Sequence, residues 1–544
     1  MFHVEHPFSG PTFPDRRARN LAQCRALMAN PPVAPEFAHL VDLSADALGT
    51  FVLFATDDYF AEKENLLKPG APEWREGAYT DKGKWMDGWE SQRRRTEGHD
   101  WAVIRLGASG RVHGALVDTT HFKGNAPQEV ALEGIDAPLT STAQALEAAT
   151  GWFEVLPRQP VKPDFPNVLR AKTPSARVTH VRLRIFPDGG VARLRVYGEV
   201  LAEPRTFWRR GSVDLAAVEN GGTIAAVSDQ FFGPPSNLLL PGRGVNMGDG
   251  WETKRRRTPG SDWCVIKLAR RGVVERLELD THYFKGNAPQ ATLVEALDEE
   301  TVGAAAVEGL LRAPKGWQTL LARTPLVQHR RHQLEPDRPL PVTHLRVHIF
   351  PHGGVNRLRV HGTALDTPAE RRALAWLHAL SADEASALFL SCCGARAWAE
   401  TMAASRPFAS ARELFAAAEN VWWKLGTTAW LDAFAAHPRI GSSKKGKAQT
   451  AKSAAWSKGE QRGVDASEKA VLAKLKALND AYFEKFGFIF IVFATGKSAP
   501  EMLALLEERV GRSKKAELET AAVEQMKITR LRLEKWLAER GGER

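Results

Sequence analysis

A stretch of about forty residues occurs twice in this chain and constrains its fold more than any other feature. The first copy, at 88–128, begins GWESQRRR and ends FKGNAPQ, and the second, at 250–290, begins GWETKRRR and ends FKGNAPQ. The two copies align without a gap, so that Asn125 matches Asn287. A duplication of this kind indicates that one structural unit was used twice.

Both copies lie within longer repeats whose apolar residues alternate in the manner of β-strands. In VTHVRLRIF at 178–186, Val181, Leu183 and Ile185 would lie on one face of a strand, with arginines on the other. VTHLRVHIF at 342–350 repeats this pattern, and each copy is followed by a Gly-Gly turn, PDGG or PHGG. Short strands separated by Gly and Pro turns predict a β-sandwich or jelly roll in each repeat.

The composition changes near residue 366. From there on, Ala, Leu, Glu and Lys dominate at helical spacing, which predicts an all-α part. Its last helix is expected over about 514–540, with four apolar residues on one face: Val523, Met526, Leu533 and Leu537. The apolar run FIFIVFATG at 488–496 interrupts the helical pattern and predicts a buried extended segment.

The predicted fold class is therefore two all-β jelly-roll (galactose-binding-like) repeats followed by an all-α domain. We expect a disordered extension at 1–36, the repeats at 37–202 and 203–366, and the helical domain at 367–544.

The composition narrows the class of protein only slightly. The 544 residues carry a formal net charge of +10 from scattered basic residues, which suits anionic small molecules as well as nucleic acid. No run of about 18 apolar residues occurs, so no membrane span is expected. The four cysteines form no disulfide or metal-ligand pattern, which predicts reduced thiols and a cytoplasmic protein.

Polar residues recur in the repeated stretch as well as apolar ones. Structure explains any single residue: Glu90 and Glu252 would pair with the nearby arginines, and Asp118 and Asp280 would cap turns. Function is favoured for the set as a whole, because a fold element requires only its apolar positions and turn glycines to recur. Here Arg, His, Lys and Asn recur too.

The histidines of the two copies do not align. His121 stands three positions after Asp118, whereas His282 stands two positions after Asp280. Alternation along a strand would send the two imidazoles to opposite faces, so we expect them not to share a role. The sequence does not decide which repeat carries a reaction.

The motifs GWE[ST]xRRR, Asp-Thr followed by FKGNAPQ, and IFPxGGVxRLRV resemble those of allantoicase, over about 330 residues. The resemblance implies jelly-roll repeats and the hydrolysis of allantoate to ureidoglycolate and urea. Allantoate is a carboxylate with two ureido arms, so Arg and Asn suit its binding, and Asp and His suit acid/base work. The candidate site residues are Arg94, Asp118, His121, Lys123, Asn125, Arg256, Asp280, His282, Lys285 and Asn287.

Two alternatives remain open for the repeats. A carbohydrate-binding module is the competing class, because jelly rolls often bind sugars. Exposed tryptophans would favour it, but the four tryptophans of the matched blocks are expected in the core: Trp89, Trp101, Trp251 and Trp263. No metal-ligand spacing supports a metal, although a divalent metal in the repeats stays open.

Three short motifs follow one another in the helical part. AAHPRIG places His437 before Pro438, where a helix ends because proline disfavours the α conformation in the preceding residue. SKGEQRG begins at Ser457, and FIFIVFATG comes later. Each has a structural explanation: a capping histidine, a helix start with Glu460 as capping-box partner, and a core segment.

In this order, HPxIG, SxxEQxG and LNxxYxxxFGFxF resemble OHCU decarboxylase, over about 370–540. The resemblance implies a helical fold without a cofactor that decarboxylates 2-oxo-4-hydroxy-4-carboxy-5-ureidoimidazoline (OHCU) to (S)-allantoin. It implies His437 and Glu460 as catalytic residues. Its substrate contacts would be Pro438, Ser457, Gln461, Ile491, Val492, Phe493, Ala494, Thr495 and Lys497. Many relatives have Arg where this chain has Lys497, which is a point charge rather than a fork.

Together the two resemblances predict a bifunctional enzyme of urate breakdown, with allantoate and OHCU as substrates. An allantoinase must act between the two steps, so channelling is not expected, and recruitment of an allantoinase is a hypothesis. We expect a homo-oligomer without nucleic-acid or membrane partners. For the helical part, the competing class is nucleic-acid binding by the lysine-rich 441–458.

Overall fold

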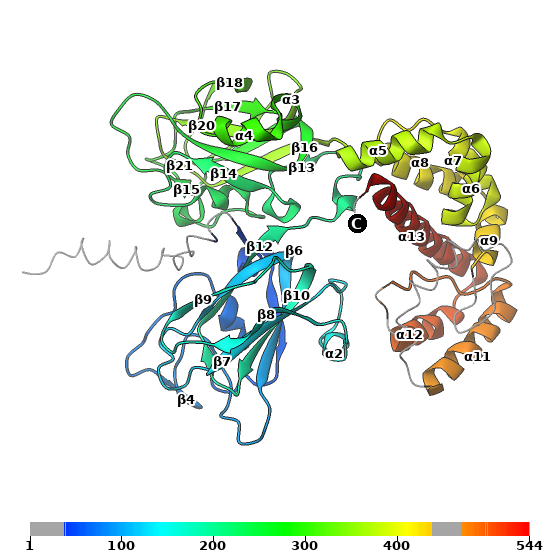
Figure 1. Ribbon diagram of the computed structural model, residues 1–544, viewed down its shortest axis with the longest axis horizontal. Coiled ribbons are helices and arrows are strands. Elements are labelled where there is room, and N and C mark those ends of the chain that lie inside the picture. Colours follow the sequence, from blue (N-terminus) through cyan, green and yellow to red (C-terminus); the bar gives the residue numbers. More distant parts are fainter. Residues whose placement is uncertain (1–36, 38–39, 438–468, 496, 498, 543–544) are drawn as a thin grey trace, which may run out of the picture.

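The computed structural model describes residues 37, 40–437, 469–495, 497 and 499–542. Two β-rich parts lie next to each other, and a helical part lies to one side of both (Figure 1). Pro438, Ser457, Glu460 and Gln461 lie outside the described residues, as do the extension at 1–36 and the lysine-rich 441–458.

The first repeat is an antiparallel β-structure with one short helix, α2 (Ala143–Glu147). Its strands are β1 (Val41–Asp42), β2 (Phe51–Ala55), β3 (Tyr79–Thr80), β4 (Gly83–Lys84), β5 (Trp89–Glu90), β6 (Asp100–Asp118), β7 (Glu129–Ile135), β8 (Phe153–Pro160), β9 (Pro166–Arg170), β10 (Arg177–Phe186), β11 (Gly190–Val191) and β12 (Arg193–Val200). The main sheet has the order β1-β12-β6-β10-β7-β8.

The 19-residue β6 organises this repeat. Its first half pairs with β2 and β10, and its second half pairs with β9 and β12. One long strand thus joins the two layers of the sandwich. Its last residue, Asp118, lies at the end of the sheet, just before the repeated FKGNAP loop.

The second repeat has the same topology, with the sheet order β13-β22-β16-β20-β17-β18 around a 19-residue β16. Its helices are α3 (Glu299–Val302) and α4 (Ala304–Leu310). Its strands are β13 (Val213–Asp214), β14 (Thr223–Val227), β15 (Trp251–Glu252), β16 (Asp262–Asp280), β17 (Ala291–Leu297), β18 (Gln318–Pro325), β19 (Arg331–Leu334), β20 (Pro341–Phe350), β21 (Gly354–Val355) and β22 (Arg357–Ala364). The predicted pair of jelly-roll repeats is confirmed.

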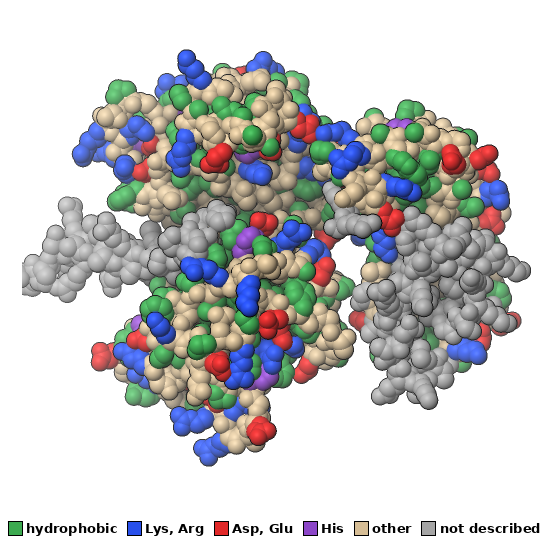
Figure 2. All heavy atoms as spheres, viewed as in Figure 1, with side chains coloured by type: hydrophobic (Ala, Val, Ile, Leu, Met, Phe, Trp, Pro, Cys, Tyr) green, Lys and Arg blue, Asp and Glu red, His purple; other side chains and the backbone are tan. Residues whose placement is uncertain are grey.

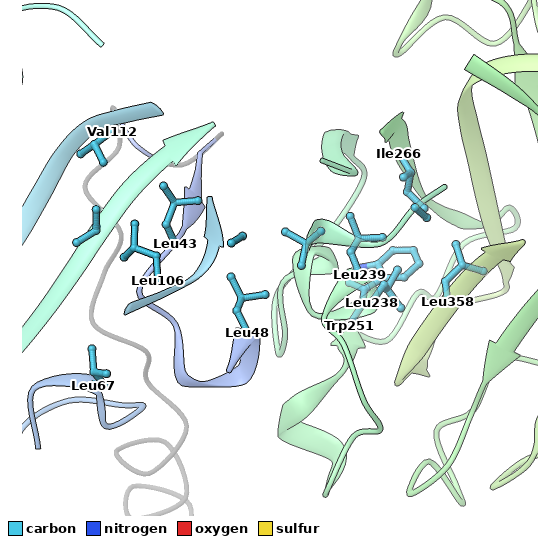
Figure 3. Close-up of a cluster of buried hydrophobic side chains, with 14 of the residues drawn as sticks. Leu43, Leu48, Leu67, Leu106, Val112, Leu238, Leu239, Trp251, Ile266 and Leu358 are labelled. Atoms are coloured by element: carbon cyan, nitrogen blue, oxygen red, sulfur yellow. The ribbon is translucent and has the colours of Figure 1, made fainter. Parts of the chain in front are cut away.

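Alternation along the strands builds the core as predicted. Val181, Leu183 and Ile185 are buried, whereas Arg182 on the other face pairs with Glu133. Apolar side chains of both repeats belong to one continuous cluster, part of which Figure 3 shows. Burial of this apolar area is the main stabilising term of the two sandwiches.

The tryptophans of the repeated stretch divide into two pairs. Trp89 and Trp251 are fully buried, and each indole N–H donates to a backbone carbonyl, at Asp57 and Asp229. Trp101 and Trp263 are half-buried and pack on smaller clusters beside the main core. These positions match the expected core role.

The C-terminal part is helical, as predicted. Its helices are α5 (Pro368–Ala379), α6 (Ala382–Cys393), α7 (Arg396–Ala404), α8 (Ala411–Lys424), α9 (Thr427–Ala435), α11 (Lys469–Phe486), α12 (Ala499–Val510) and α13 (Lys514–Gly541). Capping boxes start α5 at Thr367 and α6 at Ser381, and Gly426 separates α8 from α9. None of the described helices is long and apolar enough to span a membrane.

The 28-residue α13 lies against α5, α6, α8 and α9 in the helical part. Met526, Leu533 and Leu537 are buried, as predicted for one face, but Val523 is 42% exposed. The prediction for Val523 is wrong because neighbouring Ala521, Ala522 and Gln525 fill the buried face instead.

The apolar run after α11 is buried at its centre, as predicted for Phe490, Ile491 and Val492, but Thr495 near its end is exposed. Its residues 489–494 belong to no helix or strand. A buried network holds it. The Arg509 guanidinium donates to the Ile491 carbonyl at 2.9 Å and pairs with Glu517 at 2.6 Å. The Phe493 N–H donates to Glu524 at 2.7 Å. These side chains replace the hydrogen bonds that a sheet would have supplied.

The segment between the two repeats contacts the helical part. Trp208 is stacked on Phe415 of α8, with ring centroids 4.5 Å apart, and its indole N–H donates to Glu370 of α5 at 2.8 Å. Arg270 of β16 also pairs with Glu370, and Arg205 pairs with Glu534 of α13 at 2.7 Å. The helical part is therefore attached by side-chain contacts both to the segment between the repeats and to β16 of the second repeat.

Candidate functional site

In both repeats, the FKGNAP loop is hydrogen-bonded to the Trp-Glu strand. Asn125 Nδ2 donates to Glu90 Oε1 at 2.7 Å, and Asn287 Nδ2 donates to Glu252 Oε1 at 2.5 Å. Burial raises the pKa of both glutamates above the ordinary value, although the asparagine bonds oppose it. Each repeat thus presents a half-buried carboxyl group that retains its proton to a higher pH than usual.

A buried phenylalanine, Phe122, packs under the FKGNAP loop and fixes its position. Phe122 is fully buried against Gly190, where any Cβ would lie about 1.9 Å from the ring. Gly190 N–H donates to the Asn125 carbonyl at 2.7 Å, and Gly189 adopts φ 131°, which favours glycine. The repeated Gly-Gly turn is therefore required to bring the loop and the strand together.

The structural interpretation of the sequence paired Glu90 and Glu252 with the nearby arginines. The candidate arginines do not form these pairs. Arg94 NH1 pairs with the buried Asp100 at 2.6 Å, and Arg256 NH2 pairs with Asp262 at 2.8 Å. Each arginine therefore neutralises the carboxylate at the start of the long central strand. The Glu–Asn pair was missed because both partners are polar residues far apart in sequence.

Asp280 and His282 form a close pair in the second repeat. His282 Nδ1 lies 2.7 Å from Asp280 Oδ1, which also accepts the His282 backbone N–H at 2.8 Å. The Asp280 side chain is 4% exposed, whereas the imidazole is 39% exposed. A buried carboxylate on Nδ1 fixes the ring orientation and leaves Nε2 available for proton transfer.

Further polar groups surround this pair. The His329 ring lies 4.9 Å from the His282 ring, and Arg243 lies 4.0 Å from Asp280. The buried Asn356 donates from Nδ2 to the His282 carbonyl at 3.2 Å and to the Asn246 carbonyl at 3.1 Å. Met247 Sδ lies 3.8 Å from Asn287 Nδ2, so the 246–249 turn connects this group to the Glu252–Asn287 pair.

The first repeat has different chemistry at the same place. Asp118 accepts hydrogen bonds from the backbone N–H and hydroxyl of Thr120, at 2.9 and 2.6 Å. His121 has φ 73°, its Nε2 lies 3.3 Å from the Pro72 carbonyl, and its ring packs on Trp74. The counterpart of His121 is Tyr283, with φ 68°. The two histidines thus occupy different positions.

The candidate lysines lie at the surface. Lys123 is 77% exposed and 3.8 Å from Asp164, and Lys285 is exposed as well. Neither is held near the Asp280–His282 pair by a hydrogen bond between described residues. Over the described part of the chain, no group of three or more His, Cys, Asp or Glu side chains has the geometry of a metal site.

In the helical part, His437 follows α9 directly, and its backbone N–H donates to the Phe434 carbonyl at 3.1 Å. Burial, and then the positive charge of Arg532, lower the pKa of His437 to about 3, while Gln525 partly opposes the shift. The imidazole is therefore neutral at neutral pH. Gln525 and Arg532 both belong to α13, which places that helix beside the candidate catalytic histidine.

Of the remaining candidates in the helical part, only those in the apolar segment are described. Ile491 and Val492 are buried, Phe493 and Ala494 are half-buried, and Thr495 is exposed. Lys497 Nζ donates to the Phe493 carbonyl at 3.1 Å.

Comparison with known proteins gives both parts a family. The allantoicase repeat model matches residues 41–201 and 213–365, and the OHCU decarboxylase model matches residues 378–534. A probable allantoicase of Burkholderia mallei is 43% identical over 62% of this chain and 99% of its own length. The crystal structure of allantoicase from Saccharomyces cerevisiae is 33% identical, covers 64% of this chain and 99% of its own, and has a TM-score of 0.51. A crystal structure of OHCU decarboxylase, in the presence of (S)-allantoin, is 37% identical and covers 28% of this chain and 96% of its own, with a TM-score of 0.24.

The fold and the matches define an enzyme of purine catabolism that acts on small molecules, with a hydrolase part and a lyase part. The chain belongs to the allantoicase family, and it carries an OHCU decarboxylase domain behind the two repeats. These matches favour the enzyme over the carbohydrate-binding module.

On the face that Figure 2 shows, Lys and Arg side chains are scattered among acidic ones.

Proposed function

We propose that the repeats hydrolyse allantoate to ureidoglycolate and urea at a site in the second repeat, and that the helical part decarboxylates OHCU to (S)-allantoin. The observation that supports the choice of repeat is the Asp280–His282 pair, with a 2.7 Å contact, where the first repeat has Asp118 and Thr120.

The hydrolysis breaks a C–N bond at the central carbon of allantoate and forms a C–O bond there. Water must lose a proton, and the departing urea nitrogen must gain one. His282 Nε2 is suited to take the proton from water, because Asp280 stabilises the imidazolium that results. Burial raises the pKa of Glu252, which suits that carboxyl to donate the other proton. Asn287, bonded to Glu252, is suited to orient a ureido arm.

For the remaining candidates we propose lesser roles. Lys285 lies at the mouth of the same loop, and Arg256 supports the strand that follows. In the first repeat, Arg94, Asp118, His121, Lys123 and Asn125 maintain the matching architecture and do not contact the reacting atoms.

Decarboxylation leaves an electron pair on the ring carbon that lost carbon dioxide, and that carbon then takes a proton. A proton delivered from one side gives a single enantiomer. We propose His437 for this delivery, with Glu460 as the second catalytic residue. The imidazole is neutral when no substrate is bound, and the negative charge of the OHCU carboxylate would raise its pKa. Pro438, Ser457, Gln461, Lys497 and the backbone of 491–495 are the proposed substrate contacts.

We also propose that the domains are divided at 37–202, 203–366 and 367–544. Cys264, Cys392 and Cys393 are buried and form no disulfide, which suits a reducing compartment such as the cytoplasm. Phe231, Phe232 and Val245 are 61%, 58% and 71% exposed near the second-repeat site, which suits a contact between copies of a homo-oligomer.

An allantoinase is the proposed partner, because allantoin must be ring-opened before the repeats can act on it.

Separate assays of the intact protein test the two activities. Urea release from allantoate reports the first, and circular dichroism of the allantoin formed from fresh OHCU reports the second. His437→Ala is expected to reduce formation of (S)-allantoin at least ~100-fold, as for loss of an acid/base residue. Its urea release should equal that of the wild type. Loss of both activities in a folded variant would contradict the division of labour.

A further inference from the structure

The two repeats differ most in length between the PG turn, which both contain, and the Gly-Trp-Glu strand. Seventeen residues, 71–87, fill this interval in the first repeat, and seven residues, 243–249, fill it in the second. The short connection brings Arg243 to the Asp280–His282 pair. Arg243 NH1 lies 3.8 Å from Glu278 Oε1 and 4.0 Å from Asp280 Oδ2.

The backbone beside Arg243 is fixed. A Cβ at Gly244 would lie about 1.6 Å from Asn356 Oδ1, so only glycine fits there. The Val245 N–H donates to Asp249 at 2.9 Å, and Asp249 pairs with Arg357 at 2.9 Å. Arg243 therefore projects from an anchored turn rather than from a loose loop.

The Arg243 side chain itself is only weakly engaged. Its contacts of 3.8 and 4.0 Å are longer than hydrogen bonds, and the side chain is 59% exposed. Glu278, by contrast, already accepts a 2.6 Å hydrogen bond from Gln333. The carboxylates of Glu278 and Asp280 thus keep the Arg243 guanidinium near the Asp280–His282 pair without occupying its N–H donors. These donors have the geometry to bind a ligand carboxylate through two hydrogen bonds.

We propose that Arg243 binds the carboxylate of the substrate and so determines specificity at the second-repeat site; this inference rests on the proposed hydrolysis of allantoate. A carboxylate on Arg243 would bring the central carbon, which carries it, beside the Asp280–His282 pair. The ureido arms are rich in N–H donors and suit the carboxylate acceptor Glu278, which lies 3.8 Å from Arg243.

The first repeat has no arginine at the matching position. The residue after its PG turn is Ala71, and the next residue, Pro72, lies against His121. Trp74 of the same connection packs on the His121 ring, with centroids 5.5 Å apart. The longer connection therefore packs on His121, whereas the shorter one carries Arg243 to Asp280.

Binding of two small ligands to the full-length protein tests the proposal directly. N-carbamoylglycine has one ureido arm and a carboxylate, and N-carbamoylglycinamide replaces that carboxylate by a neutral amide. Calorimetry should show that the wild type prefers the acid by ~10–100-fold, as for charge-assisted hydrogen bonds. Arg243→Ala should lose the preference, and Arg243→Lys should retain part of it. Arg276→Ala, which removes an exposed arginine from β16, the strand that ends at Asp280, should behave as the wild type.

Kinetics provide the second measurement. Arg243→Ala should raise KM for allantoate ~10–100-fold with kcat within ~3-fold, since the carboxylate is bound equally before and during reaction. A retained acid preference in Arg243→Ala, an equal loss in Arg276→Ala, or no preference in the wild type would each overturn the inference. Absence of urea release by the wild type would instead overturn the proposed function, whatever the ligands show.

Discussion

The two repeats share one fold and one topology, yet they differ at the end of the sheet where the long central strand stops. Both retain the Glu–Asn pair and the buried phenylalanine under the loop. At four matched positions, however, Thr120, His121, Asp164 and Asn167 of the first repeat become His282, Tyr283, His329 and His332 of the second. Recurrence therefore identifies the shared architecture, and the differences within it are the basis of our proposal that the second repeat carries the chemistry.

The largest difference between the repeats is expected at the two matched buried aspartates, Asp280 and Asp118. Asp280→Asn should reduce urea release ~10³–10⁴-fold, because an amide no longer stabilises the imidazolium and can hold the wrong tautomer of His282. Asp118→Asn, the matched control, should remain within ~3-fold, because its partner Thr120 is not an acid or a base. Steady-state kinetics of both variants make the comparison. Equal losses would indicate that the repeats share the reaction.

A smaller difference is expected between the two glutamates. Glu252→Gln keeps an acceptor for Asn287 but carries no proton to donate, so kcat should fall ~10²-fold, whereas Glu90→Gln should stay near the wild type. Because burial raises the pKa of Glu252, the activity that uses its proton is full below that pKa and declines as the pH rises through it. The pH profile of kcat should lose this alkaline limb in Glu252→Gln.

The stability of these two variants should be alike. Burial raises the folded-state pKa of both Glu90 and Glu252, so their contribution to stability is present at low pH and is lost as the pH rises through the raised pKa. Both glutamine variants should therefore melt at or above the wild-type temperature at neutral pH. A marked loss of stability in only one would indicate that its carboxylate is ionised and paired.

The smallest effect on hydrolysis is expected from removal of the helical part. A chain ending at residue 367 retains both repeats, and its kcat for allantoate should stay within ~3-fold, because no contact joins the Asp280–His282 pair to the described residues of the helical part. Its melting temperature should fall, since Trp208 loses Phe415 and Glu370. Thermal melts and urea assays of the same preparation make the measurement. Loss of hydrolysis in a folded truncated chain would place part of the site in the helices.

Local pattern was enough to predict much of this structure. Alternation predicted the buried faces of β10 and β20, and the change to helical spacing near residue 366 predicted the helical part. The face of α13 was predicted less well, because small residues such as Ala521 occupy the buried stripe and Val523 is left outside it. Periodicity alone does not distinguish a small buried side chain from an exposed one.

The site was harder to predict because its contacts are tertiary. The pairing of Glu90 with Asn125, and of Glu252 with Asn287, depends on how the Gly-Gly turn brings the loop to the strand. The sequence favoured the nearer arginines, which pair with Asp100 and Asp262 instead. Arg243 is outside every repeated motif, and only the length of its connection places it near Asp280.

The central claim is that the second repeat carries the hydrolysis through His282. Measurement of kcat for urea release by His282→Ala, beside Thr120→Ala at the matched position and His121→Ala in the first repeat, tests it most directly. We predict that His282→Ala loses ~10²–10⁴-fold and that the other two remain within ~3-fold of the wild type. A folded His282→Ala protein with near-normal kcat, or a comparable loss in His121→Ala, would contradict the claim.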